Sequence, residues 1–126
     1  MIDFANEGFF ARLRKVSDSS YSRIVGDLLI PGESIIGSYQ SVRDGVVFTS
    51  KRIIAVNIQG VTGKKIDYTS IPYSKITTFS VESSGVFDLD CELEIYISGV
   101  GKVKFQFTGS TDIKEICRNI SIFSLD

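Results

Sequence analysis

Apolar and polar residues along this chain of 126 residues follow two different periods. Between residues 33 and 108 they alternate in short runs, which is the two-residue period of strands with one buried face. In residues 21–29 and 111–124 apolar side chains instead recur every three or four positions, as in an amphipathic helix. The pattern therefore predicts a sheet with helical segments before and after it.

Residues 1–30 are expected to be helical. From Tyr21 onward the apolar spacing is that of a helix, which Asp18 or Ser19 can cap and which Pro31-Gly32 ends. The preceding segment holds a looser apolar set, interrupted by Gly8: Phe4, Phe9, Phe10, Leu13 and Val16. We interpret residues 1–30 as an N-terminal helical extension and residues 31–126 as the main domain.

Seven strands are expected in the middle of the chain, with turn residues between them. They run over Glu33–Val42, Val46–Thr49, Arg52–Ile58, Lys64–Ile71 and Ile76–Ser83, and the last two begin near Cys91 and Lys102. Asp44-Gly45 is typical of a tight hairpin, and Gly60 and Gly63 allow a longer one. The last two strands alternate cleanly, so acidic residues of one are expected to face lysines of the other.

A final helix is expected to cover one end of this sheet. Asp112 or Thr111 can cap it, and its apolar residues share one face: Ile113, Ile116, Cys117, Ile120 and Phe123. A curled sheet with an open end offers the surface that such a face needs. The sequence therefore predicts a mainly β fold, a seven-stranded antiparallel barrel or sandwich capped by a C-terminal helix.

Several predicted strands carry apolar residues on both faces. In Arg52–Ile58, for example, Ile54 and Val56 point one way while Ile53 and Ala55 point the other. A sheet with one solvent-exposed face needs apolar residues only on its other face. We expect residues 1–30, another subunit, or both to cover the outer face.

The composition narrows the possible functions. Formal net charge is −1, so no nucleic-acid partner is expected. Histidine is absent, which removes the commonest general base and metal ligand, and we expect neither catalysis nor a cofactor. Cys91 and Cys117 take apolar positions and are expected to be small buried residues. No signal peptide or membrane span is evident, so the expected location is the cytoplasm.

Three motifs that suggest chemistry have simpler interpretations. Gly63-Lys64-Lys65 lacks the first glycine and the final Ser or Thr of a phosphate-binding loop, and fits a solvated hairpin tip. The acidic residues between Asp88 and Glu94 lack the spacing of a calcium loop and fit a solvated strand face. The serines have neither a GxSxG elbow nor a histidine to activate them.

The middle of the chain resembles the pleckstrin-homology-like fold, and in particular the small stand-alone bacterial pleckstrin-homology domains. The resemblance rests on residues 44–56, 59–65, 70–76 and 79–93, followed by the helix at 111–124. It implies that Phe87 and Leu89 plug the open end of the barrel. It also implies a binding or scaffolding module without catalytic residues that self-associates, with a ring as one arrangement. Eukaryotic relatives that bind phosphoinositides carry a basic cluster on the loop between the first two strands, whereas this loop has Arg43 alone, beside Asp44.

The function predicted from these observations is non-enzymatic binding of a protein or peptide partner by a homo-oligomer. The Gly60–Lys65 hairpin is the expected contact, with Lys64, Lys65 and Arg43 as binding residues. The alternative is a peripheral membrane adaptor, in which apolar residues of an N-terminal helix enter the lipid while a local basic patch meets anionic headgroups.

Overall fold

The structure, a computed structural model, describes residues 1–83, 90–108 and 111–125. Within them the chain forms eight strands and two α-helices, with a short 3₁₀ turn after the first helix and another after the fifth strand. The elements are β1 (Gly8–Val16), α1 (Ser19–Val25), η1 (Gly26–Leu28), β2 (Ile35–Gln40), β3 (Gly45–Thr49), β4 (Arg52–Gln59), β5 (Lys65–Pro72), η2 (Tyr73–Lys75), β6 (Thr78–Glu82), β7 (Cys91–Ile97), β8 (Gly101–Phe107) and α2 (Ile113–Ser124).

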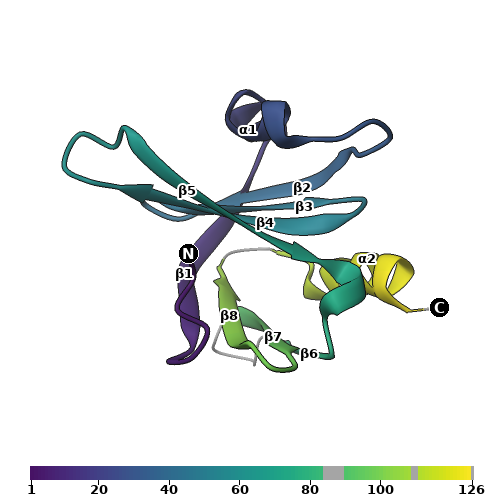
Figure 1. The fold of residues 1–126 in the computed structure, drawn as a ribbon. Helices are drawn as coiled ribbons and strands as arrows, with labels where there is room; N and C mark the ends of the chain where they lie inside the picture. Colours follow the sequence, from purple (N-terminus) through teal and green to yellow (C-terminus); the bar gives the residue numbers. More distant parts are fainter. Residues whose placement is uncertain (84–89, 109–110, 126) are drawn as a thin grey trace.

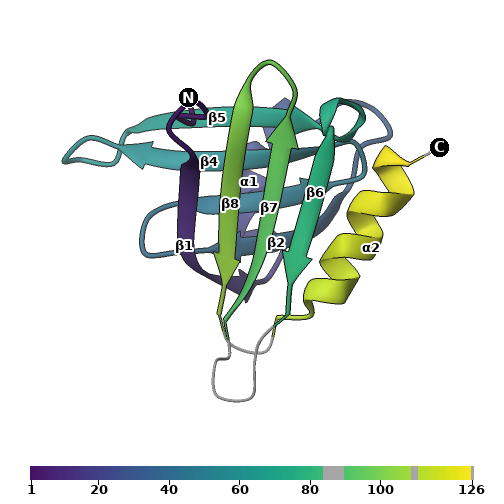
Figure 2. The same cartoon turned by 90° about the horizontal axis from the view of Figure 1, so that it is seen from below.

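One strongly bent sheet forms the body of the molecule, with the strand order β5-β4-β3-β2-β1-β8-β7-β6. Its two halves face each other, and the strands of β6–β8 cross those of β2–β5 (Figures 1 and 2). Helix α1 lies on the outer face of the β2–β5 half, while α2 lies beside β6 where the two halves part (Figures 1 and 2). The expected curled sheet with a helix across its open end is confirmed.

All seven strands predicted between residues 33 and 108 are present, and β1 is an eighth strand that the pattern did not predict. The helical interpretation of residues 1–30 holds for 19–25 but is wrong for 8–16. Strand β1 lies in the middle of the sheet, antiparallel to β2 and parallel to β8. Residues 8–16 therefore share the sheet with the strands that follow.

A bulge in β1 explains why this strand was mistaken for a helix. Phe10 lies opposite Phe105 and Leu13 lies opposite Phe107, so three steps along β1 match two steps along β8. Arg12, inside the bulge, has a φ of 56°, in the left-handed region. The extra residue places Phe10 and Leu13 on the same face although they are three positions apart. Three is also a helical spacing, so the two patterns look alike in sequence.

The inner core lies between the two halves of the sheet and is closed by α2. Aromatic rings meet at its centre: Tyr39 packs edge-on against Phe107 at 4.9 Å between ring centroids, and Phe10 stacks on Phe105 at 5.3 Å. The buried residues of α2 are Ile113, Ile116 and Ile120. As predicted, Asp112 caps this helix, and its side chain accepts a hydrogen bond from the amide of Glu115 at 3.1 Å.

A second, smaller core lies on the outer face of the β2–β5 half. Tyr21 and Val25 of α1 pack there on Val47, Ile54 and Val56. The outer apolar residues of β4 are thus covered by the chain's own α1 segment, while Ile53 and Ala55 on its other face belong to the inner core. This cover does not need a second subunit.

Two further expectations concern β7, β8 and the loop before them. Lys104 of β8 lies within 3.8 Å of both Glu92 and Glu94 of β7, which confirms the predicted pairing across these strands. The predicted plug of Phe87 and Leu89 lies outside the described residues.

The contact between α1 and the sheet gives a first testable prediction. A Cβ atom added at Gly45 would overlap the phenol of Tyr21, which is itself buried. Gly45→Ala should therefore destabilise the protein by about 1–3 kcal/mol, as overpacking does elsewhere. Gly26→Ala is the matched control, because no atom lies within 4 Å of the added Cβ, and it should be neutral or stabilising by up to about 1 kcal/mol. Urea unfolding of both variants measures this, and equal stabilities would refute the close packing.

Candidate functional site

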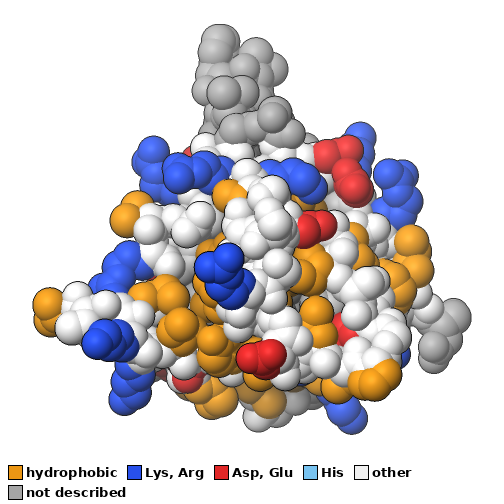
Figure 3. Space-filling model, turned by 90° about the horizontal axis from the view of Figure 1, so that it is seen from above, with side chains coloured by type: hydrophobic (Ala, Val, Ile, Leu, Met, Phe, Trp, Pro, Cys, Tyr) orange, Lys and Arg blue, Asp and Glu red, His pale blue; other side chains and the backbone are white. Residues whose placement is uncertain are grey.

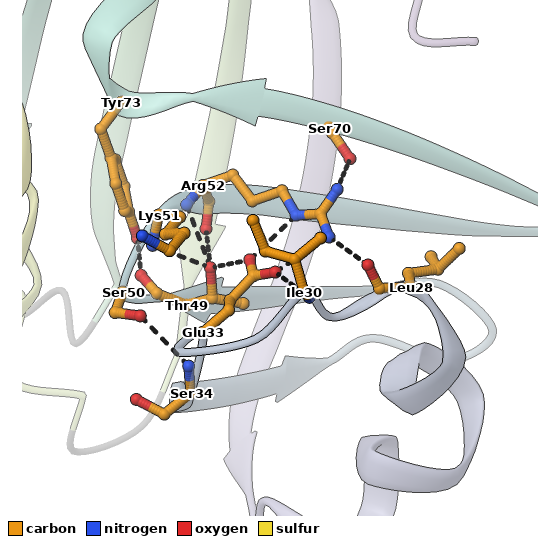
Figure 4. Close-up of polar contacts among 10 residues, drawn as sticks. All are labelled: Leu28, Ile30, Glu33, Ser34, Thr49, Ser50, Lys51, Arg52, Ser70 and Tyr73. Atoms are coloured by element: carbon orange, nitrogen blue, oxygen red, sulfur yellow. Dashed lines mark hydrogen bonds and ion pairs between the residues drawn. The ribbon is translucent and has the colours of Figure 1, made fainter.

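A buried ion pair joins the segment after η1 to the sheet. The side chain of Glu33 has no solvent exposure, and its carboxylate accepts hydrogen bonds from Arg52 Nε at 2.9 Å and Nη2 at 3.0 Å (Figure 4). The same guanidinium donates to the carbonyl of Leu28 at 2.5 Å and to Ser70 Oγ at 3.1 Å. Arg52 thus joins the loop residue Glu33 to η1 and to β5.

Neighbouring groups satisfy the remaining hydrogen bonds of this pair. Thr49 Oγ1 donates to Glu33 Oε2 at 2.6 Å, and the amide of Ile30 donates to Oε1 at 3.1 Å. Tyr73 Oη donates to the carbonyl of Thr49 at 2.8 Å (Figure 4). Burial by itself would raise the pKa of Glu33, but the hydrogen bonds from Arg52, Thr49 and Ile30 and the charge of Arg52 lower it below its ordinary value. None of the buried side-chain polar atoms that the structure describes lacks a partner, so we assign this network a role in holding the fold together.

The three binding residues predicted from the sequence lie in the β2–β3 turn and in the neighbouring β4–β5 hairpin, where Lys65 is the first residue of β5. Arg43, in the β2–β3 turn, donates from Nη2 to the carbonyl of Gly60 in the β4–β5 hairpin at 2.7 Å. The hairpin continues through Lys64 to Lys65, and both lysines are exposed. We call Arg43, Lys64 and Lys65, together with Val42 and Val61 of the same loops, the basic tip.

Backbone geometry fixes the shape of the basic tip. Gly60 and Gly63 have φ angles of 78° and 69°, which glycine adopts without strain and which the hairpin needs to turn. Asp44 accepts a hydrogen bond from the amide of Ile58 at 2.9 Å, so the turn and the hairpin are linked on this side too. The carboxylate of Asp44 is thereby bound to the protein's own backbone rather than to Arg43.

The basic tip projects from the body of the molecule. In Figures 1 and 2 the β4–β5 hairpin extends beyond the other strands, and in Figure 3 Lys and Arg side chains gather on this projection with an apolar side chain at its end. Val42 is 95% exposed and Val61 is fully exposed. Among the described residues, no acidic side chain forms an ion pair with Lys64, Lys65 or Arg43. This surface can bind an acidic partner by charge and by apolar contact.

The N-terminal segment does not have the shape that the membrane alternative requires. Phe4, Phe10 and Leu13 are buried in the inner core, and β1 is a strand rather than an amphipathic helix. Only Phe9 of this apolar set is well exposed. Residues 1–16 therefore do not form the amphipathic helix that the membrane alternative expects, and membrane contact itself stays a prediction.

The cysteines and the potential metal-binding side chains do not form a further site in the described part of the chain. Cys91 is buried in the inner core, as expected, and burial raises the pKa of its thiol, while Cys117 on α2 is only half-buried. No three potential metal-binding side chains come together within the described part of the chain. None of the helices that the structure describes has the length and apolar character of a membrane span.

The bent eight-stranded sheet with a C-terminal helix at its open end defines a pleckstrin-homology-like fold. The chain matches the family model "Bacterial PH domain" over residues 5–123, and it belongs to this family. This confirms the resemblance to bacterial pleckstrin-homology domains that the sequence shows between residues 44 and 93.

Known relatives support the assignment over most of the chain. The uncharacterised protein YjqA of Bacillus subtilis (strain 168) is 41% identical over 112 residues, which are 87% of this chain and 90% of YjqA. A DUF1696-family protein with a pleckstrin-homology domain from Shewanella loihica PV-4 has 38% identity and a TM-score of 0.79, covering 90% of this chain and 98% of that one. A pleckstrin-homology domain from Shewanella amazonensis SB2B has 39% identity and a TM-score of 0.66, covering 88% and 90%.

The buried ion pair gives a prediction for stability. Arg52→Met leaves the Glu33 carboxylate buried without its cation and should cost about 3–5 kcal/mol of unfolding free energy. Arg23→Met is the matched control, because Arg23 is exposed on α1 and its replacement should have little effect.

The pH dependence of stability gives a second prediction. Since the folded-state pKa of Glu33 is lowered, its ionisation stabilises the fold above the ordinary carboxyl pKa. This contribution is lost as pH falls through the folded-state pKa.

Unfolding by urea between about pH 6 and about pH 3 measures both effects. The wild type should lose more stability over this range than Glu33→Gln, in which the titrating group is missing. Parallel losses in the two proteins would contradict the role assigned to Glu33.

Proposed function

We propose that this protein is a non-enzymatic binding module that docks onto an acidic protein or peptide through the basic tip. The observation that carries the proposal is the projection of Arg43, Lys64 and Lys65 from two linked loops, together with the exposed Val42 and Val61. Charge complementarity of this kind steers a partner to the surface and selects against basic ones.

The linked loops favour binding because they are already held in shape. Arg43 and Asp44 tie the β2–β3 turn to the β4–β5 hairpin through hydrogen bonds of 2.7 and 2.9 Å. A surface that is ordered before binding loses less conformational entropy when it docks. Exposed charge pairs contribute only about 0.2–1 kcal/mol each, so a single tip should bind weakly and with a strong dependence on salt.

Self-association would raise this weak affinity. A homo-oligomer, with a ring as one arrangement, presents several basic tips to one partner, and linked contacts bind more tightly than each contact alone. The oligomer is expected from the family resemblance, and the cytoplasm remains the expected location.

The test for the binding surface is an affinity pull-down with the full chain as bait. The Lys64→Ala/Lys65→Ala double variant should lose the proteins that the wild type captures at low salt, because it lacks two of the three cations of the tip. Lys51→Ala/Lys114→Ala is the matched control, with the same charge change at two exposed lysines elsewhere. Capture by the wild type should fall as salt rises.

The pull-down and a flotation assay together distinguish two acidic partners, a protein and an anionic membrane. Retention of every captured protein by the Lys64→Ala/Lys65→Ala variant would place the binding surface elsewhere. The exposed valines also favour a second candidate, an anionic membrane, in which Val42 and Val61 enter the interface. Flotation of the wild type with phosphatidylserine vesicles, abolished by Val42→Asp/Val61→Asp, would identify the partner as a lipid surface instead of a protein.

Self-association has its own measurement. Light scattering coupled to size exclusion should give a mass that is a multiple of the 13.9 kDa chain at micromolar concentration. A stable monomer at that concentration would contradict the oligomeric part of the proposal and leave the basic tip to be judged by the pull-down.

A further inference from the structure

A cavity lies between the end of β1 and the beginning of α2, and it shares no residue with the basic tip. Its volume is about 400 Å³, within the range typical of sites for small molecules. The residues around it come from β1, β2, α2 and the segments after β8 and before α2: Arg14, Lys15, Tyr39, Thr108, Thr111, Asp112 and Glu115.

The sheet side of the cavity brings a cation and a phenol together. Lys15 of β1 lies opposite Tyr39 of β2 in the strand register, and its Nζ is 5.5 Å from the centre of the Tyr39 ring. A Cβ atom placed on the neighbouring Gly37 would lie 3.6 Å from Tyr39 Oη and 3.9 Å from Lys15 Nζ. The two polar groups therefore lie near each other beside Gly37, which is not itself part of the cavity wall.

The hydroxyl of Tyr39 has no partner in the described part of the chain. Only 5% of this residue is exposed, and its ring is held edge-on by Phe48 and Phe107. No buried side-chain polar atom of the described residues lacks a hydrogen-bond partner, so the Tyr39 hydroxyl is the part of this residue that is open to the cavity. Burial, followed by the charge of Glu115, raises the pKa of Tyr39 to about 12, so the hydroxyl is a donor at neutral pH.

The helix side of the cavity carries the opposite charge. Asp112 uses one oxygen to cap α2, whereas the carboxylate of Glu115 has no hydrogen bond or ion pair with any described residue. Arg14 and Lys15 likewise form no ion pair in that part of the chain. Two cations and two anions therefore line one cavity without neutralising each other.

We propose that this cavity binds a small zwitterion of the amino-acid or dipeptide class. The carboxylate of such a ligand would accept hydrogen bonds from Lys15, Arg14 and the Tyr39 hydroxyl, and its ammonium group would donate to Glu115. Each charged end meets the opposite charge, and the unpartnered phenol gains an acceptor. Ligands that carry only one of the two charges leave one wall of the cavity unmatched.

The test is a titration of the ¹⁵N-labelled full chain, followed by NMR. The probes are the standard α-amino acids and glycylglycine, each at millimolar concentration. At least one probe should shift the amide signals of Lys15, Tyr39 and Glu115 with saturation. The N-acetylated form and the methyl ester of that probe each lack one charge and should bind about tenfold more weakly, the effect expected for losing one charge-assisted hydrogen bond.

Variants of the chain locate the binding. Lys15→Met and Glu115→Gln should each weaken binding of the same probe about tenfold. Tyr39→Phe should weaken it severalfold while it retains the ring packing that the fold needs. Lys114→Met, one residue away from Glu115 and outside the cavity, is the control and should bind as the wild type does, as should Lys64→Ala/Lys65→Ala.

Two results would overturn the proposal. One is the absence of saturable shifts with every probe in the folded wild type. The other is equal binding by the wild type and by Lys15→Met and Glu115→Gln variants whose amide spectra show that they are folded. Since the basic tip contributes nothing to this cavity, either result leaves the proposed function intact.

Discussion

The pairing of β1 with two strands at once is the constraint on which the rest of the structure depends. Its antiparallel contact with β2 and parallel contact with β8 join the two halves of the sheet. Phe10 and Leu13 of this strand are buried in the inner core, so backbone pairing and side-chain burial act together. The bulge at Arg12 lets one strand follow both halves, because an extra residue bends the strand and increases its twist.

The ion pair of Glu33 and Arg52 is the second constraint, and it concerns the outer face. Through Arg52 the carbonyl of Leu28, at the end of η1, is bound to β4 and to Ser70 of β5. This anchors the segment that carries α1 over the second core. A buried pair is a poor source of net stability when its desolvation is considered, but losing one partner is costly. Its role is therefore to fix where the outer cover lies.

The two proposed sites differ in the signs of their charges and in the shape of their surface. At the basic tip Lys64 and Lys65 are exposed to water, which favours weak, salt-dependent docking of large surfaces. In the cavity beside α2 the largely buried Tyr39 and charged side chains of both signs, which are themselves exposed, share a space of about 400 Å³ that suits a small ligand. β1 contributes to the second site directly, since Arg14 and Lys15 follow its bulge. The shape of the central strand thus determines both the fold and the cavity.

Local patterns were enough to predict the seven strands from 33 to 108 and the cap at Asp112, because period and turn chemistry act over a few residues. They also placed Arg43, Lys64 and Lys65 in loops, but only the fold brings Arg43 within 2.7 Å of the Gly60 carbonyl. The sequence pattern does not predict a strand at residues 8–16, because the bulge gives its apolar residues the spacing of a helix. The meeting of Lys15, Tyr39 and Glu115 had no signal in the sequence, since these residues lie far apart in the chain. Pairing between distant strands and the docking of α2 brought them together, and such contacts depend on the packing of the whole core.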